Sequence, residues 1–213
     1  MQYDLHVHTN YSADGLVSPI DMARHLKKQG FAGMAITDHD TVAGALKSYD
    51  LSGFLIIPGI EISTTQGHLL GLGITAEINS RDPSTAIGEI HAQGGIAVIP
   101  HPFRRPSPSI SNIIGLDVDA IEVFNGRNFP WQNEQAATLA TRHKLPTTGG
   151  SDAHQLWEAG TGYTIAEAET VDDLLSCIKA GEITAWGKTS LRRPLHSMAG
   201  TLRRFMDRGF RRI

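Results

Sequence analysis

Two histidines one residue apart, His6 and His8, stand near the start of the chain, and Asp14 follows six residues later. In an extended strand, residues i and i+2 point to the same side, so these two imidazoles share one face. A buried imidazole needs partners for both ring nitrogens. Two imidazoles on one face, followed by a carboxylate, offer ligands to a metal ion. Metal binding is therefore the chemistry to test against the rest of the chain.

Side chains of the same types stand at the ends of most other apolar runs. They are Asp38, His39 and Asp40 after "MAIT", Glu61 in "PGIEIS", His68 in "HLLGLG", His101 in "IPHP", and Asp152 and His154 in "GSDAH". Taken singly, each is more often a surface residue or a helix cap than a ligand. Six of the chain's ten histidines, counting His6 and His8, nevertheless stand at such places. One shared site is the better interpretation.

Short runs rich in Val, Ile and Leu alternate with segments of helical pattern, and these elements must position the candidate ligands. Strands are expected at residues 3–8, 33–37, 54–60, 68–74, 96–100, 120–124 and 147–150, and helices at 19–29, 84–93, 133–143 and 171–180. The alternation favours a parallel α/β fold, and a distorted seven-stranded TIM-like (β/α)7 barrel fits better than an open sheet. In such barrels the C-terminal ends of the strands meet at one mouth, so distant ligands come together.

Charge divides the chain into a predicted barrel domain, residues 1–187, and a basic tail, residues 188–213. The tail holds eight Lys or Arg and one Asp, whereas residues 1–187 carry a net charge of −10. Apolar residues recur in the tail at close to helical spacing, at Leu195, Met198, Leu202, Phe205, Met206, Phe210 and Ile213. We expect an amphipathic helix that packs on the barrel. A membrane-surface helix and a nucleic-acid contact are the alternatives.

The bulk composition indicates a cytoplasmic protein. No apolar run reaches the roughly 18 residues that a transmembrane helix needs. The N-terminal residues lack the charged and apolar regions of a signal peptide. Cys177 is the only cysteine, which excludes an internal disulfide and a thiolate-rich zinc site.

The motifs "HVHTNYSADG", "ITDHD", "PGIEIS", "HLLGLG", "IPHP" and "GSDAH" follow one another over roughly residues 1–187. In this order they resemble the PHP (polymerase and histidinol phosphatase) family, and the ordered set is highly specific. The resemblance implies a distorted seven-stranded barrel with two or three divalent metal ions at its mouth. It assigns the metal ligands to His6, His8, Asp14, His39, Glu61, His68, His101, Asp152 and His154. Every one of these positions holds His, Asp or Glu.

The resemblance also implies how the ions share these ligands. One ion would be held by His6, His8, Glu61 and Asp152, a second by Glu61, His68 and His101, and a third by Asp14, His39 and His154. Nitrogen and oxygen ligands without thiolate suit Mn, Zn or Fe. Such ions can share a hydroxide that attacks phosphorus, so the implied reaction is hydrolysis of a phosphate ester.

Four residues are candidates for catalytic roles beside the metals. Asp152 or His154 would manage the proton of the leaving group. Arg104 and Arg127 follow strand ends, and the fork of an arginine matches phosphate oxygens, so we expect them to contact the substrate phosphate. Ordinary surface arginines are the alternative.

The expected substrate is a small phosphorylated molecule: a nucleoside bisphosphate, a short RNA or a phosphorylated metabolite. A histidinol-phosphatase-like activity, an amidohydrolase acting on C–N bonds, and a non-catalytic metal-binding module that engages nucleic acid are the alternatives. The strand-end set contains no lysine suited to bridging metals, which argues against the amidohydrolase. The full ligand set argues against a non-catalytic module.

Overall fold

Nine strands form one sheet in the computed structural model, which describes residues 1–47, 51–188, 190–192, 194–197 and 199. In chain order they are β1 (Gln2–Val7), β2 (Gly33–Ile36), β3 (Leu55–Ser63), β4 (His68–Leu72), β5 (Ile96–Ile99), β6 (Ala120–Asn125), β7 (Thr147–Gly150), β8 (Gly162–Ile165) and β9 (Thr184–Gly187). Their order across the sheet is β7-β6-β5-β4-β3-β2-β1-β8-β9. The seven predicted strands correspond to β1 to β7.

The sheet curls until β1 and the residues after β7 meet, which nearly closes it into a barrel. Val7 and Ala153 form a parallel bridge. Around it, the His8 amide donates to the Ala153 carbonyl at 2.8 Å, and the Asp152 amide donates to the His6 carbonyl at 2.7 Å. The chain segments that carry the first and the last candidate ligands are therefore hydrogen-bonded to each other.

The prediction of seven strands was wrong, because β8 and β9 extend the sheet beyond β1. β8 pairs antiparallel with β1, and β9 pairs antiparallel with β8. Each has only four residues, and residues of β9 alternate between exposed and half-buried. Their sequences, GYTI and TAWG, contain glycine and no run of Val, Ile and Leu, so the apolar pattern gave no signal for them.

Among the seven strands β1 to β7, β4 runs against its neighbours. β4 is antiparallel to both β3 and β5, whereas the pairs β1–β2, β2–β3, β5–β6 and β6–β7 are parallel. The first residue of β4, His68, consequently lies at the end of the barrel where the parallel strands finish. Because of this reversal, a candidate ligand begins β4, whereas His6 and Glu61 lie near the ends of their strands and the other candidate ligands follow strands.

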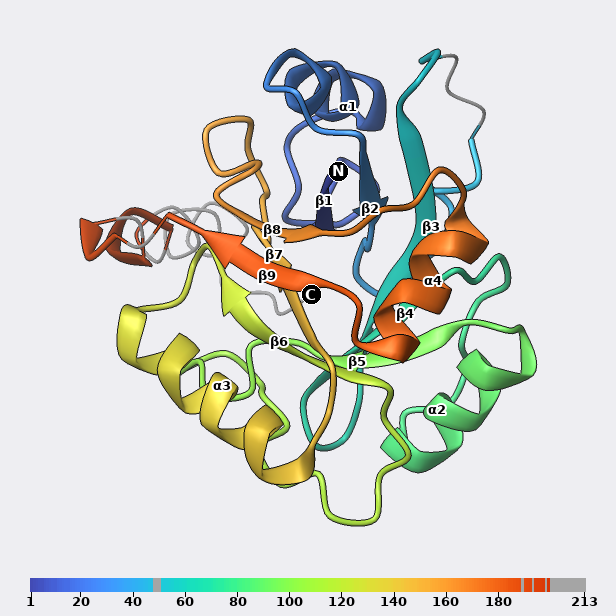
Figure 1. Ribbon diagram of the computed structural model, residues 1–213, viewed down its shortest axis with the longest axis vertical. Coiled ribbons are helices and arrows are strands. Elements are labelled where there is room, and N and C mark those ends of the chain that lie inside the picture. The colour runs from blue at the N-terminus through green and yellow to red at the C-terminus, as the bar shows by residue number, and fades with distance from the viewer. Residues whose placement is uncertain (48–50, 189, 193, 198, 200–213) are drawn as a thin grey trace.

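Four helices complete the fold: α1 (Pro19–Lys28), α2 (Pro83–Ala92), α3 (Pro130–His143) and α4 (Val171–Ala180). Helices α1, α2 and α3 lie around the outside of the sheet (Figure 1). Each of these three has proline in its first turn, where the missing N–H is not needed. Ser18 caps α1 and Asp82 caps α2 through their side-chain oxygens. The helices lie close to their predicted ranges.

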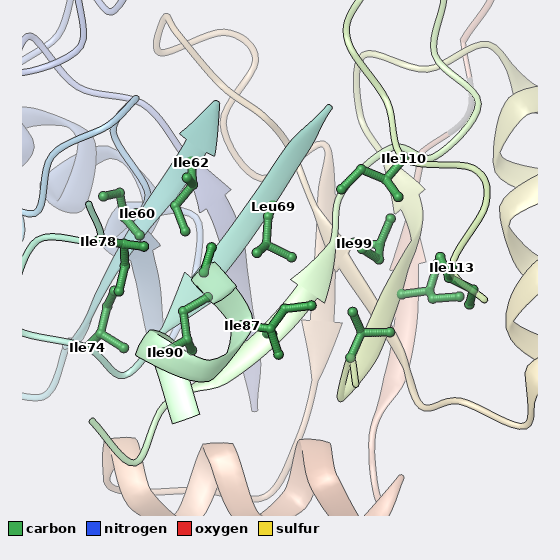
Figure 2. Close-up of a cluster of buried hydrophobic side chains, with 14 of the residues drawn as sticks. Ile60, Ile62, Leu69, Ile74, Ile78, Ile87, Ile90, Ile99, Ile110 and Ile113 are labelled. Carbon is green, nitrogen blue, oxygen red and sulfur yellow. The ribbon is translucent and has the colours of Figure 1, made fainter. Parts of the chain in front are cut away.

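The hydrophobic core lies in three clusters. Figure 2 shows the largest, in which isoleucines of β3, β5 and α2 pack on Leu69 of β4. A second cluster joins α1 to β1 and β2. In the third, Leu174, Leu175 and Ile178 of α4 pack with residues at or near the first residues of parallel strands, Tyr3 of β1, Ile96 of β5 and Ala120 of β6. Helix α4 therefore closes the barrel at the end away from the candidate ligands.

Most of the predicted tail helix lies outside the described residues. This holds for Met198, Leu202, Phe205, Met206, Phe210 and Ile213 and for the arginines among them. Of the described tail residues, Leu195 is exposed, whereas Pro194 and Ser197 are buried. Whether the apolar stripe packs on the barrel stays a prediction, as does a domain boundary at residue 187. Among the described residues, no helix has the length and apolar character to cross a membrane.

Candidate metal centre

The candidate ligands come together at the end of the barrel opposite α4. They are His6, His8, Asp14, His39, Glu61, His68, His101, Asp152 and His154, of which His39 and His68 are half-buried and the other seven buried. Because β1, β3, β5 and β7 all bring ligands to this end, residues far apart in sequence form one cluster. Their role as metal ligands stays a prediction.

Five imidazoles surround the carboxylate of Glu61. Its Oε2 atom lies 3.1, 3.4 and 3.3 Å from ring nitrogens of His8, His6 and His39. Its Oε1 atom lies 2.9 and 3.0 Å from ring nitrogens of His68 and His101. Each oxygen of one carboxylate therefore faces a different group of imidazoles, as a carboxylate that bridges two cations requires.

A second carboxylate, that of Asp14, faces the other side of the cluster. Its Oδ2 atom lies 2.7 Å from Nε2 of His154 and 3.7 Å from Nε2 of His39. The rings of His8 and His154 are stacked with their centroids 4.3 Å apart. Ligand atoms of His8, Asp14, His39 and His154 all lie within 4.8 Å of one another, close enough for one ion.

Three further groups of ligand atoms in the described part of the chain are close enough to hold an ion. They are His6, His8 and Glu61; His6, His101 and Asp152; and His39, Glu61 and His68. The groups share members, so they do not divide into the three sets that the resemblance implies. The clusters could bind divalent metal, while the number of ions and their individual ligands stay predictions.

Buried polar atoms without partners test whether a cation fits. Asp14 Oδ1, His39 Nδ1 and His68 Nδ1 are buried and make no hydrogen bond. His68 Nδ1 even lies 2.9 Å from Glu61 Oε1 without hydrogen-bond geometry. Leaving such atoms unsatisfied costs about 1–3 kcal/mol each. Because His68 Nδ1 and Glu61 Oε1 lie this close without bonding each other, and Asp14 Oδ1 and His39 Nδ1 make no hydrogen bond, a cation suits the site and the residues fit the expected ions.

Charges and burial in the cluster shift the pKa values of the candidate ligands. Burial raises the pKa of Glu61, but the surrounding imidazoles hold it well below its usual range. Burial, reinforced by Arg104, lowers the pKa of His101 to about 3. Burial also lowers the pKa of His6, but the nearby carboxylates, Asp152 foremost, raise it well above its usual range. The shifts of Glu61 and His101 favour an anionic carboxylate and a neutral imidazole, the states that bind cations, whereas His6 must release a proton before it can bind one.

Two of the four non-glycine residues with positive φ in the described part of the chain are candidate ligands. His101 has a φ of 30° and Asp152 a φ of 56°, both in the left-handed region that side chains other than glycine rarely adopt. Such conformations cost on the order of 1–3 kcal/mol and persist where surrounding structure enforces them, which is common at functional sites. The strain directs both side chains into the cluster immediately after β5 and β7.

Both candidate phosphate-binding arginines lie at the cluster and contact Asp152. Arg104 Nη2 lies 2.6 Å from Asp152 Oδ2, an ion pair without hydrogen-bond geometry, and Arg104 Nε donates to Asn128 Oδ1 at 2.9 Å. Arg127 Nη1 donates to Asp152 Oδ1 at 3.3 Å and lies 2.9 Å from His154 Nδ1. Neither is an ordinary surface arginine. Their catalytic roles stay predictions.

Glu122 is a supporting residue that the sequence interpretation missed. Its Oε1 atom lies 3.0 Å from His6 Nδ1, and its Oε2 atom accepts from the backbone amide of His101 at 2.9 Å. A carboxylate on the far nitrogen of a ligand histidine fixes the tautomer and the orientation of the ring. The available signal was a charged residue in the middle of the apolar run "AIEVF".

Asp38 supports the cluster without joining it. Its oxygens accept from the Thr9 amide at 2.6 Å, the Thr9 hydroxyl at 2.7 Å and the Ser12 hydroxyl at 2.9 Å. Ser12 Oγ in turn accepts from the His39 amide at 2.8 Å and lies 3.3 Å from His8 Nδ1. Asp38 therefore anchors the loop that holds Asp14 to the segment that holds His39.

A nearly closed barrel with many imidazoles and carboxylates at one end defines a class of protein, the metal-dependent hydrolases built on a β/α barrel. Residues 4–144 match the profile of the PHP domain, and residues 130–183 match that of the PHP-associated region. The chain belongs to the PHP family. The family resemblance of the sequence motifs is thereby confirmed.

Three similar proteins illustrate the relationship. The protein MJ0417 of Methanocaldococcus jannaschii is 33% identical over 173 residues, which cover 76% of this chain and 69% of that protein. The 5'-3' exoribonuclease Rnm of Salmonella typhimurium is 41% identical over 81 residues, which cover 34% of this chain and 27% of the exoribonuclease.

Among solved structures, the fold resembles a two-domain protein of Bacteroides vulgatus that contains a predicted PHP-like metal-dependent phosphoesterase. The TM-score is 0.69 at 19% identity, and the match covers 88% of this chain and 64% of that one. This chain thus spans less than two thirds of the exoribonuclease and of the Bacteroides protein. At 19% identity, the likeness to the Bacteroides protein concerns the fold alone.

Proposed function

We propose that this protein is a metal-dependent phosphoesterase that hydrolyses a phosphate ester at the cluster around Glu61. The observation that carries the proposal is the carboxylate of Glu61, which has imidazoles within 3.4 Å of both oxygens. The arginines beside Asp152 add the positive charge that a phosphate needs. Membership of the PHP family, with a phosphoesterase and an exoribonuclease among the similar proteins, supports this assignment.

The ligands, the two arginines and the pair His154 and Asp152 have different proposed roles. Divalent ions held by the candidate ligands would activate water and neutralise charge on phosphate oxygens. Arg127 and Arg104 would bind the phosphate oxygens that face away from the ions, because a guanidinium donates two parallel hydrogen bonds to such a group. His154, through a ring nitrogen, or Asp152, through a carboxylate oxygen, would hold the proton that passes to the leaving oxygen.

The substrate that we propose is a nucleotide, either a nucleoside bisphosphate or a short RNA. The similarity to the exoribonuclease, at 41% identity over 81 residues, supports it. A phosphorylated metabolite such as histidinol phosphate is the competing substrate. A basic tail beside an acidic barrel domain would help to attract an anionic chain.

A substrate screen with Mn-loaded protein tests the proposal. Phosphomonoesters, nucleoside bisphosphates, short oligoribonucleotides and C–N amide substrates are compared, with His8→Ala as the control variant. We expect release of phosphate or of mononucleotides by the wild-type protein and a large loss with His8→Ala. Equal rates for both proteins indicate a contaminating phosphatase. Turnover of amides alone, or of nothing by fully metal-loaded protein, refutes the proposed function.

A further inference from the structure

One buried carboxylate beside the cluster is not among the candidate ligands. Glu158 is 3% exposed and lies in the loop after β7. Its Oε2 atom accepts from the backbone amide of His154 at 2.8 Å and from that of Gln155 at 3.1 Å. Glu158 therefore holds the main chain of a candidate ligand rather than a cation.

The other oxygen of Glu158 faces Arg127. The distance from Glu158 Oε1 to Arg127 Nε is 3.9 Å, and Nη1 of the same guanidinium lies 2.9 Å from His154 Nδ1. Glu158 therefore contacts two neighbouring parts of the cluster, the backbone of His154 and the side chain of Arg127. It orients the backbone of His154 and attracts the guanidinium that contacts the His154 ring.

A residue from the start of the tail completes the coordination of Glu158. The hydroxyl of Ser197 donates to Glu158 Oε1 at 2.7 Å, and both side chains are buried although they are 39 residues apart. The neighbouring rings of Trp157 and His196 are perpendicular, with centroids 6.5 Å apart. Residues 194–197 therefore dock directly behind the loop that carries His154.

We infer that Glu158 and Ser197 are positioning residues, through which the segment 194–197 sets the geometry of His154 and Arg127. The inference rests on the proposed function, since it assumes that His154 is a metal ligand. A hydrogen bond from Ser197 fixes the rotamer of Glu158, because a buried carboxylate turns toward its donors. Without it, Glu158 Oε1 loses its buried donor, and the side chain can shift and release the amide of His154. The ligand atoms of Asp14, His39 and His154 are then no longer held in position for a shared ion.

The test compares Ser197→Ala, Ser197→Thr and Glu158→Gln with wild type, and Ser84→Ala, an exposed serine of α2, serves as the matched control. Metal-free protein is titrated with Co²⁺, and the visible absorption and the number of bound ions are recorded. We expect Ser197→Ala and Glu158→Gln to weaken the last ion bound by about 10-fold or more, as supporting residues typically do. Ser197→Thr keeps the hydroxyl and restores the wild-type titration.

A second measurement separates positioning from general damage to the fold. Thermal unfolding of the metal-free variants should match wild type within a few degrees, while kcat falls more than KM rises on any substrate that the screen identifies. Co²⁺ titrations of Ser197→Ala that match wild type overturn the inference, as do equal losses for Ser197→Ala and Ser197→Thr. Because the titration needs no turnover, it decides the inference even if the phosphoesterase proposal fails.

Discussion

At the scale of single residues, the site depends on pairs in which one side chain holds another. Glu61 brings the imidazoles together, but Glu122 orients His6, and Asp38 orients the loop of Asp14 through Ser12. The candidate ligands were predictable because histidine and carboxylate residues at strand ends have few structural uses in such numbers. Their supporting residues were harder to identify, since a single Glu or Asp in or after an apolar run does not indicate which side chain it will contact.

Replacement of Glu122 by glutamine tests the role of these supporting residues. The amide keeps the size of the side chain but removes the charge that faces His6 Nδ1 at 3.0 Å. We expect metal affinity or activity to fall by about 10–100-fold, the usual effect of losing such a partner. Inductively coupled plasma mass spectrometry and kcat/KM measure the two effects. Glu134→Gln, at an exposed position of α3, is the control, and equal values for both variants contradict the prediction.

Replacement of Arg127 by alanine tests phosphate binding. A charge-assisted hydrogen bond contributes about 1.5–3 kcal/mol, so kcat/KM should fall by roughly 10–100-fold. Steady-state kinetics give this ratio, and metal analysis of the same preparation should show unchanged ion content. Arg142→Ala, at an exposed position in the last turn of α3, should behave as wild type. Unchanged kinetics in the Arg127 variant remove this residue from the site.

At the scale of elements, seven strands and four helices follow from apolar periodicity and caps, whereas the reversal of β4 and the pair β8–β9 do not. A strand looks the same in sequence whichever way it runs, so His68 was recognised as a ligand candidate before its strand's direction was known. The four-residue strands β8 and β9 depend on partners that only the folded sheet supplies.

The closure between β1 and β7 leaves no space for a side chain at residue 150. A methyl group at Gly150 would lie 2.5 Å from His6 Cβ and 2.9 Å from Glu122 Oε1. Gly150→Ala should therefore destabilise the protein by roughly 1–3 kcal/mol, as overpacking usually does, and reduce its metal content. Urea denaturation measures the first effect. Gly88→Ala in α2, where nothing lies within 4 Å, should leave stability unchanged or raise it.

The cap of α2 gives stability a defined dependence on pH. Asp82 accepts from the amide and the hydroxyl of Thr85, both at 2.9 Å, and these bonds lower the pKa of its carboxyl below 3.8. A lowered pKa in the folded state means that ionised Asp82 stabilises above pH 3.8 and that this contribution is lost as pH falls below it. At pH 7, the Asp82→Asn variant should have a lower urea midpoint of unfolding than wild type. The difference between the two midpoints should be smaller at pH 3. A constant difference contradicts this account.

At the scale of the whole molecule, the cluster gathers buried carboxylates and imidazoles at one end of the barrel and leaves some of their atoms without hydrogen bonds. Asp14 Oδ1, His39 Nδ1 and His68 Nδ1 make no hydrogen bond with the described residues. A cation that binds only the folded state stabilises it in proportion to the logarithm of its concentration. The barrel and its ions are therefore expected to be thermodynamically linked.

Removal of metal tests this linkage. Treatment with a chelator should lower the thermal unfolding midpoint, and each tenfold increase in added Mn²⁺ above the dissociation constant should restore about 1.4 kcal/mol per ion bound. Differential scanning calorimetry over a range of Mn²⁺ concentrations measures the effect. Ca²⁺, which prefers oxygen ligands, is the control and should have less effect. A midpoint that does not respond to Mn²⁺ contradicts the linkage.

The bridge between Val7 and Ala153 also determines when the centre exists during synthesis. A nascent chain that has exposed β1 to β6 presents most of its imidazoles but lacks Asp152, His154 and the strand that closes the barrel. Contacts between such distant parts of a chain form late, because the intervening loop must first lose its entropy. A ribosome-bound intermediate would offer incomplete coordination, and metal insertion becomes one of the last events of maturation.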